Sequence, residues 1–256
     1  MDVQRHAGRI AIVTGAANGI GRATAVRLAR EGASVHGCNR GDDARARAQA
    51  EFDAAGLDIT LHKADVSSQP DVDALVAAVG RRVDVLANVA GVMDGYQPLG
   101  DLDDDVWDRV IAVNLTGVMR MSRAVLPRML AQGGGAIVTV ASRAALGAGP
   151  AGVSYAASKH GVLGLVKSIC WCYGPRGIRS NAVLPGGVES GMHASAGTNE
   201  SPRTGWAYER AALAKATMPP KARADEIAAA VSWLASGEAS NVNGAVMTVD
   251  GGWSSA

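Results

Sequence analysis

The chain of 256 residues is long for one domain but ordinary for a single α/β unit. Its formal net charge of +1 argues against the strong field with which proteins attract nucleic acids or anionic membranes. Aromatic residues make up only 4% of the chain, so its core must be built from Ala, Val, Leu and Ile.

The cysteines, the first nine residues and the longest apolar run bear on where the protein works in the cell. The three cysteines, Cys38, Cys170 and Cys172, contain no C-x-x-C pair, and their odd number argues against a disulfide framework or a zinc site. The first nine residues are polar, unlike a signal peptide, and the apolar run 161–173 is too short to span a bilayer. We therefore expect a soluble, cytoplasmic protein without a metal, a nucleic-acid partner or a membrane partner.

Short β-rich runs alternate with helical stretches along the whole chain. The predicted strands are residues 9–14, 34–38, 59–64, 83–87, 136–141, 179–184 and 245–249. The predicted helices are residues 19–30, 42–55, 69–79, 103–130, 155–173 and 224–235. Several strands are nearly continuous apolar runs, which is typical of strands covered on both faces. The alternation predicts an α/β fold of right-handed βαβ units, with a doubly wound, parallel, seven-stranded sheet in a single domain, 1–256.

One stretch, residues 189–220, breaks this alternation. It is rich in Gly, Ser, Thr, Asn, Pro and Ala, and long segments of this kind are usually lids or disordered. Because apolar and aromatic residues are interspersed in it, we expect a lid over a ligand site, with short helices around residues 203–216.

A glycine-rich turn follows the first predicted strand. The run TGAANGIG at residues 14–21 permits a sharp change from strand to helix and lets backbone N–H groups approach a pyrophosphate. Its place between a strand and an amphipathic helix predicts a dinucleotide site. The spacing G-x-x-x-G-x-G differs from the more common G-x-G-x-x-G.

Tyr155 and Lys159 lie four residues apart in a predicted helix, so their side chains share one face. A free phenol ionises near pH ~10, and an ammonium one turn away lowers that pKa. The pair can therefore act as a general acid and base. The same spacing also arises by chance on amphipathic helices, so it gains weight only beside other motifs.

Together these motifs resemble those of the short-chain dehydrogenase/reductases in their single-domain form. Further matching motifs are Asp65-Val66, the run NVAG at 88–91, Asn114, Ser142, the run PGGVES at 185–190 and the run VDGG at 249–252. The resemblance covers nearly the whole chain. It implies a Rossmann-type fold, a nicotinamide cofactor and an alcohol dehydrogenase or ketone reductase that acts on CH–OH groups.

The resemblance also implies which residues hold the cofactor. They are Gly15, Asn18, Gly19, Ile20, Gly21, Asn39, Arg40, Asp65, Val66, Asn88, Ala90, Gly91, Tyr155, Lys159, Pro185, Gly186, Val188 and Ser190. Val89 stands where relatives usually carry Asn, and Ser190 where they usually carry Thr.

The end of the second strand bears on the choice between NAD and NADP. Asn39 stands where an acidic residue would bind the ribose 2′-OH, and Arg40 can pair with a 2′-phosphate. The neutral Asn18 and the nearby Asp42 and Asp43 argue the other way. We expect NADP(H), with NAD(H) and a merely solvated Arg40 as the alternatives.

By the same resemblance, the catalytic residues are Asn114, Ser142, Tyr155 and Lys159. Tyr155 exchanges the proton with the substrate oxygen, Lys159 lowers the pKa of the phenol and binds the nicotinamide ribose, and Ser142 stabilises the developing charge. Asn114, at a bend in its helix, would hold a water that completes a proton relay.

The substrate is less defined than the cofactor. Met93, Arg143, Ala144, Met192 and Trp206 are the expected wall of the pocket and indicate a small, mostly apolar molecule. A 3-oxoacyl thioester reductase, an enoyl reductase or epimerase, and a catalytically silent nucleotide sensor or scaffold remain alternatives. The helix at 155–173 is apolar on most faces, and the resemblance implies a homotetramer through the fourth and fifth predicted helices.

Overall fold

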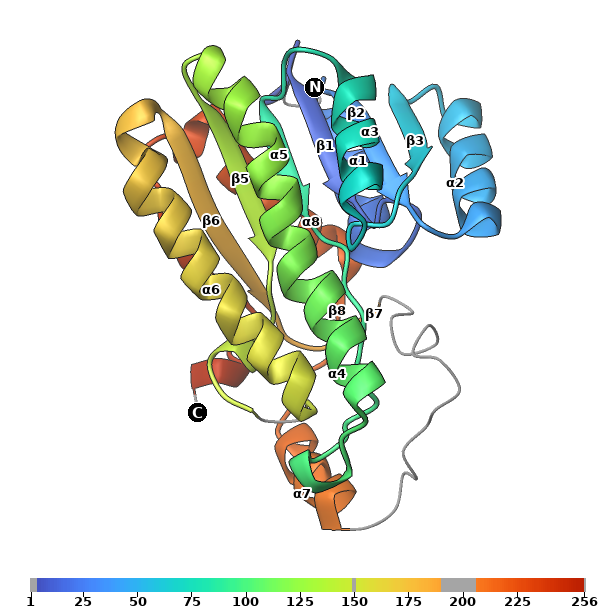
Figure 1. The fold of residues 1–256 in the computed structure, drawn as a ribbon, viewed down its shortest axis with the longest axis vertical. Helices are drawn as coiled ribbons and strands as arrows, with labels where there is room; N and C mark the ends of the chain where they lie inside the picture. Colours follow the sequence, from blue (N-terminus) through green and yellow to red (C-terminus); the bar gives the residue numbers. More distant parts are fainter. Residues whose placement is uncertain (1–3, 149–150, 190–205, 256) are drawn as a thin grey trace.

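The computed structural model describes residues 4–148, 151–189 and 206–255. Its centre is a seven-stranded sheet in the order β3-β2-β1-β4-β5-β6-β9, with every neighbouring pair parallel (Figure 1). The strands are β1 (Ile10–Thr14), β2 (Ser34–Asn39), β3 (Ile59–Lys63), β4 (Val85–Asn88), β5 (Gly135–Val140), β6 (Ile178–Pro185) and β9 (Val246–Val249). The predicted doubly wound parallel sheet is confirmed.

Helices cover both faces of the sheet. One face carries α1 (Gly19–Arg30), α2 (Asp42–Ala54) and α8 (Ala224–Ala235). The opposite face carries α3 (Gln69–Val79), α5 (Gly117–Ala131) and α6 (Val153–Tyr173). The two cores are aliphatic, as the low aromatic content requires, and the single phenylalanine, Phe52, is buried on the α1 face.

The long helix expected over residues 103–130 is interrupted. It consists of α4 (Asp104–Ile111), a π-helical turn at Ala112–Thr116, and α5. The expected bend at Asn114 is therefore a π-helical turn, a feature that often marks functional positions in helices. Directly after it, Gly117 lets α5 approach the loop that follows β3, because a Cβ there would lie 2.8 Å from Cγ2 of Val66.

The order of the strands indicates where a ligand can bind. The chain runs outward from β1 through β2 and β3 on one side, and from β4 onward on the other. A crevice forms at such a reversal, outside the carboxyl ends of the strands. Beyond these ends lies α7 (Trp206–Ala216), near the two-stranded sheet of β7 (Val188–Glu189) and β8 (Ala222–Arg223) (Figure 1).

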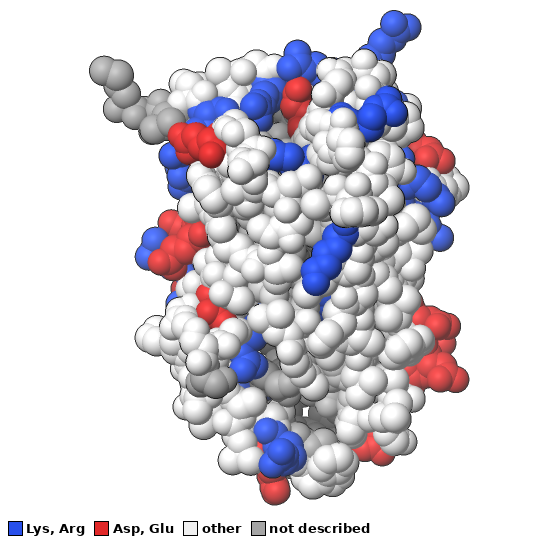
Figure 2. Space-filling view, turned by 90° about the vertical axis from the view of Figure 1, so that its left-hand side faces the viewer, with Lys and Arg blue, Asp and Glu red and all other residues white. Residues whose placement is uncertain are grey.

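The side of the molecule next to α6 carries few charges in its centre, whereas charged residues gather at its margins (Figure 2). On α6 the exposed positions are mostly small or apolar, and the side chain of Trp171 is 84% exposed. Across the described residues, no helix combines the length and the apolar character needed to cross a bilayer.

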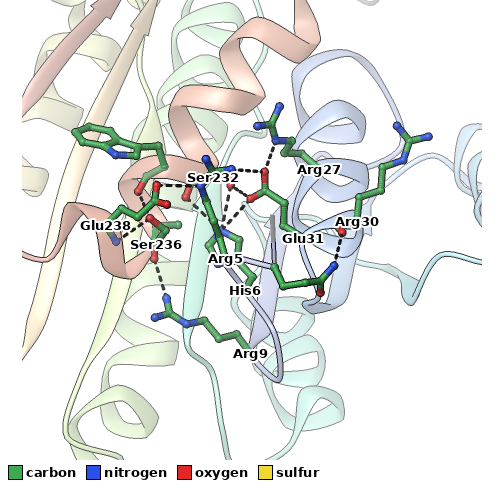
Figure 3. A network of polar contacts seen from close by, with 12 residues as sticks. Arg5, His6, Arg9, Arg27, Arg30, Glu31, Ser232, Ser236 and Glu238 are labelled. Carbon is green, nitrogen blue, oxygen red and sulfur yellow. Dashed lines mark hydrogen bonds and ion pairs between the residues drawn. The ribbon is translucent and has the colours of Figure 1, made fainter. Parts of the chain in front are cut away.

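A polar network ties the N-terminal segment to α1 and α8 (Figure 3). Glu31, at the end of α1, pairs with Arg5 and Arg27 and accepts a hydrogen bond from the hydroxyl of Ser232 on α8. The buried ring of His6 lies 3.1 Å from the Ser232 hydroxyl through Nε2. These contacts hold the start of the chain at the opposite end of the sheet from the crevice.

Candidate functional site

The glycine-rich turn has the geometry of an anion cradle. Gly15 has a φ of +69°, and a Cβ there would lie 3.1 Å from Cα of Ala90. A Cβ on Gly21 would lie only 2.1 Å from the carbonyl oxygen of Gly15. Both positions therefore require glycine, and the turn brings the first residues of α1 against the end of β1.

The N-terminus of α1 fits a phosphate group. Within this fully described helix, the N-cap Asn18 makes no side-chain capping bond and the first turn contains no acidic residue. The first N–H groups of a helix have no partner inside the helix and carry its positive dipole end. Here they can be satisfied by an anion, so the residues present fit the pyrophosphate of a dinucleotide.

The loop after β4 is fastened to the glycine-rich turn. The hydroxyl of Thr14 accepts hydrogen bonds from the backbone N–H groups of Val89 at 2.9 Å and Ala90 at 3.0 Å. Asn88 is buried, and its Oδ1 has no hydrogen-bond partner among the described residues. A buried acceptor of this kind fits a ligand hydroxyl, since buried polar atoms are normally paired.

The expected adenine and ribose residues lie at the ends of β2 and β3. Asp65 follows β3, accepts hydrogen bonds from the N–H and hydroxyl of Ser67, and lies 3.5 Å from the Arg40 guanidinium. Burial works to raise the pKa of Asp65, but these hydrogen bonds and Arg40 outweigh it and lower the pKa. Asn39 donates to the Gly41 carbonyl, and the side chain of Arg40 is 74% exposed at the mouth of the crevice.

The segment after β6 comes close to the chain near its C-terminus. The N–H of Gly186 donates to the carbonyl of Val249 at 3.3 Å, and a Cβ on Gly186 would lie 2.9 Å from Cβ of Asp250. Pro185 ends β6 and Val188 starts β7. Ser190 lies outside the described residues.

Tyr155 and Lys159 occur together on α6, as their spacing predicts. Both are almost fully buried, and Nζ of Lys159 lies 5.6 Å from the centre of the Tyr155 ring. The same Nζ donates to the carbonyl of Val140 at the end of β5, at 3.1 Å. Burial lowers the pKa of Lys159 to about 8.

The pKa of the Tyr155 phenol differs from the expectation. Burial raises it to about 12, a hydrogen bond with Ser142 acts in the opposite direction, and the nearby Asp94 and Tyr96 add to the rise. The sequence argument expected Lys159 to lower this pKa. In the protein without cofactor, burial dominates because the site withholds water from the phenolate.

Asn114 lies behind the loop after β4 and not at its surface. Its side chain accepts from the N–H of Val92 at 2.8 Å and donates to the Val92 carbonyl at 3.0 Å. Its amide also lies 3.3 Å from the hydroxyl of Ser158 on α6. The side chain therefore joins the loop to α6, and its part in a proton relay stays a prediction.

Only some of the expected substrate residues lie close together in the structure. Met93 and Ala144 are buried in one apolar cluster with Tyr155. The Arg143 guanidinium lies 4.2 Å from the centre of the Trp253 ring, which gives this residue a partner within the chain. The side chain of Trp206 is 69% exposed at the start of α7, and Met192 lies outside the described residues.

Two residues beside the site had no individual role in the sequence analysis. Asp94 is buried and accepts a hydrogen bond from the backbone N–H of Tyr155 at 2.8 Å. Tyr96 has a φ of +65°, unusual for a residue with a side chain, and its ring lies 4.1 Å from Nζ of Lys215 on α7. The sequence contains no signal for Asp94, because Ser154 directly before the predicted helix at 155–173 looks like an ordinary N-cap, whereas in the structure α6 begins earlier, with Gly152 at the N-cap.

Together these residues form a buried acid/base group next to a dinucleotide cradle. Ser142 supplies a hydroxyl, Tyr155 a phenol and Lys159 an ammonium, all at the carboxyl ends of β5 and β6. A carbonyl oxygen placed between the hydroxyl and the phenol would receive two hydrogen bonds and a proton.

Comparisons with known proteins agree with this geometry. A family model described as Enoyl-(Acyl carrier protein) reductase matches residues 15–254. The chain is 36% identical over 262 residues to 3beta-hydroxysteroid dehydrogenase 2 of Eggerthella lenta, covering 99% of each. It is 38% identical over 250 residues to the short-chain dehydrogenase/reductase cdmF of Talaromyces verruculosus, covering 96% of each. A crystal structure of a variant actinorhodin polyketide ketoreductase with NADPH matches with a TM-score of 0.87, 36% identity and 100% coverage of both chains.

Proposed function

This chain belongs to the short-chain dehydrogenase/reductase family and is an NAD(P)-dependent oxidoreductase of carbonyl and hydroxyl groups, and we propose that Tyr155 is its general acid and base. The observation that carries the proposal is the burial of Tyr155 and Lys159 on one face of α6, with Nζ of Lys159 5.6 Å from the centre of the Tyr155 ring. A buried phenol beside a buried ammonium serves proton transfer and not solvation.

The proton path follows from these contacts. When bound, the reduced nicotinamide supplies the hydride for the carbonyl carbon, and the oxidised form accepts it in the reverse reaction. Ser142 donates a hydrogen bond to the substrate oxygen and Tyr155 transfers its phenolic proton to it. Lys159 stabilises the resulting phenolate electrostatically, and a proton from solvent restores the phenol, through Asn114 and a water in our proposal.

We propose NADP(H) as the preferred cofactor. Asn39 removes the acidic charge that would repel a 2′-phosphate, and Arg40 has an exposed guanidinium next to Asp65. The ion pair with Asp65 is long, at 3.5 Å, so Arg40 can turn to a phosphate at little cost. The actinorhodin ketoreductase structure contains NADPH, which supports the same choice.

We propose a small, mostly apolar ketone or secondary alcohol as substrate. Met93 and Ala144 give the side of the site next to Tyr155 an apolar surface. Residues 189–220 would act as a lid of the single domain, with Trp206 among the residues that contact the substrate; Met192, the other expected lid contact, lies outside the described residues. The contact of Lys215 on α7 with the Tyr96 ring supports a lid position for this helix.

A second candidate is reduction of an activated C=C bond. It is favoured by the description of the matching family model, which names an enoyl reductase. Against it stands the hydroxyl of Ser142 beside the phenol, an arrangement suited to a carbonyl oxygen.

The test is a panel of probes with product analysis. Purified protein is first melted with NADPH and with NADH at equal concentration, because ligand binding to the folded state raises the melting temperature. It is then given cyclohexanone, a 3-ketosteroid, an enone and an acetoacetyl thioester with the better cofactor. Alcohol formed from a simple ketone supports the proposal. A saturated ketone from the enone as the sole product would establish the second candidate, and cofactor binding without turnover would favour a silent nucleotide sensor.

We also propose a cytoplasmic homotetramer. The weakly charged side next to α6 and the exposed Trp171 support an interface that includes α5 and α6 (Figure 2). All three cysteines are free, in keeping with a reducing compartment. Light scattering at micromolar concentration tests the assembly, and a monomeric mass would contradict it.

A further inference from the structure

The catalytic helix α6 begins without a cap of its own. Its N-cap is Gly152, which has no side chain to accept a hydrogen bond, and the first turn contains no acidic residue. The N–H groups of this turn include that of Tyr155. Because the turn is buried, an unpaired N–H there would cost stability.

Asp94, in the loop after β4, fills this gap from outside the helix. Its Oδ2 accepts from the N–H of Tyr155 at 2.8 Å and from the hydroxyl of Ser154 at 3.2 Å. Gly152 makes room for the carboxylate, since a Cβ there would lie 2.4 Å from the same oxygen. The glycine and the aspartate are thus two halves of one capping arrangement.

The second carboxylate oxygen holds the substrate side of the site. Oδ1 of Asp94 accepts from the N–H of Tyr96 at 3.1 Å, and Tyr96 takes the left-handed φ of +65°. A short turn closed by an aspartate side chain makes such a conformation less costly. One buried carboxylate therefore fixes both the turn that carries Tyr155 and the loop that carries Tyr96.

We propose that Asp94 is a positioning residue of the reaction, which caps α6 at the backbone N–H of Tyr155 and so holds a negative charge at the start of the helix that carries the reacting phenol. This role rests on the proposed function of Tyr155. The groups that face the phenol are Asp94 and Tyr96 from the loop after β4, Ser142 from the end of β5, and Lys159 from α6.

The charge of Asp94 acts against that of Lys159. A carboxylate next to a phenol disfavours the phenolate and raises the pKa of Tyr155. It keeps the phenol protonated, which suits a group that must donate a proton to a carbonyl oxygen. The neutral variant Asp94→Asn keeps the shape and one acceptor oxygen but loses this effect.

The experiment titrates the phenol directly, without a substrate. Phenolate absorbance is recorded against pH with saturating NADP⁺ for the parent and for Asp94→Asn, each corrected by its Tyr155→Phe counterpart. We expect the Tyr155 midpoint in Asp94→Asn to fall by about one pH unit. Asp103→Asn is the matched control, because Asp103 lies in the same loop but accepts from Gln97 at 2.9 Å. Its midpoint should equal that of the parent.

Two further measurements guard against misfolding. Asp94→Ser also removes the charge while keeping an acceptor oxygen, and its midpoint should fall in the same direction. In the parent, hydrogen exchange of the Tyr155 amide should be as slow as that of Ala156, whose N–H donates to the Gly152 carbonyl. An unchanged or higher midpoint in the folded neutral variants, or a rapidly exchanging Tyr155 amide, would overturn the proposal.

The outcome is separable from the proposed function. If no probe ketone is reduced, the proposed activity is wrong, but the titration still tests whether the Asp94 carboxylate raises the pKa of Tyr155. If a ketone is reduced, the pH profile of kcat/KM should move with the phenol midpoint in Asp94→Asn and stay in place in Asp103→Asn. If Asp94→Asn lowers kcat but leaves the pH profile of kcat/KM unchanged, Asp94 has only a structural role.

Discussion

Replacing Gly21 by alanine should damage both stability and cofactor binding. The new Cβ would lie 2.1 Å from the carbonyl oxygen of Gly15, which is 1.3 Å short of ordinary van der Waals contact at 3.4 Å. Overpacking of this kind costs ~1–3 kcal/mol, and the upper part of the range applies because both sides of the clash are backbone. The better helix propensity of alanine returns up to ~1 kcal/mol, which leaves a net loss of about 2 kcal/mol.

The loss should also appear in the affinity for NADPH. Relief of the clash moves the Gly15 carbonyl and thereby the turn that would hold the pyrophosphate, so we expect Kd to rise at least ~10-fold, or ~1.4 kcal/mol. Urea unfolding and a fluorescence titration with NADPH measure the two effects. Gly100→Ala is the control, since a Cβ there has no heavy atom within 4 Å and should change neither quantity by more than ~0.5 kcal/mol. If Gly21→Ala has the stability and NADPH affinity of the parent, the glycine-rich turn does not hold the pyrophosphate in the way described.

The remaining predictions concern selectivity and acid stability. Arg40→Ala should weaken NADPH binding ~10-fold or more and leave NADH binding within ~2-fold, as measured by paired titrations. An equal loss of affinity for both cofactors would show that Arg40 does not select NADPH over NADH. Acidification should destabilise the protein, because burial lowers the pKa of His6 below its ordinary value of 6.5 and because hydrogen bonds and guanidinium groups outweigh burial to lower the pKa of Glu31. Both groups bind fewer protons when folded, so the contribution of His6 is lost as the pH falls below about 6.5 and that of Glu31 only as it falls below about 4.5. The difference between the urea unfolding midpoints at about pH 7.5 and about pH 5 should be smaller in His6→Gln than in the parent. An equal difference in both proteins would contradict a role for His6 in the acid sensitivity.

The regular elements were predictable because each follows from a local pattern. The apolar runs predicted all seven strands of the main sheet to within a few residues, and α1, α3 and α8 begin and end where the patterns place them. The helix expected over 103–130 has nearly the observed span, 104–131, but its apolar pattern continues through the π-helical turn and does not reveal the interruption. Within the π-helical turn, Asn114 bonds to Val92 and lies close to Ser158, which are distant in sequence, so no local pattern reveals these contacts.

The proximity of the expected site residues was predictable, but their electrostatics were not. Motif order placed Tyr155, Lys159 and Ser142 close together, as they are in the structure, and their catalytic roles stay predictions; the pKa of Tyr155 depends on burial, which spacing does not reveal. Asp94 was missed for a related reason: its partner is a backbone N–H contributed by another element 61 positions away. The sequence concealed the missing cap, because Ser154 stands directly before the predicted helix, whereas the N-cap in the structure is Gly152.

The central claim is that Tyr155 transfers the proton in an NADPH-dependent carbonyl reduction. The most direct measurement compares the parent with Tyr155→Phe, recording NADPH affinity and steady-state ketone reduction in the same preparations. The account predicts affinity within ~2-fold of the parent and turnover lower by at least ~100-fold, because the ring remains and the proton donor is lost. Turnover equal to that of the parent, with cofactor bound, would contradict it.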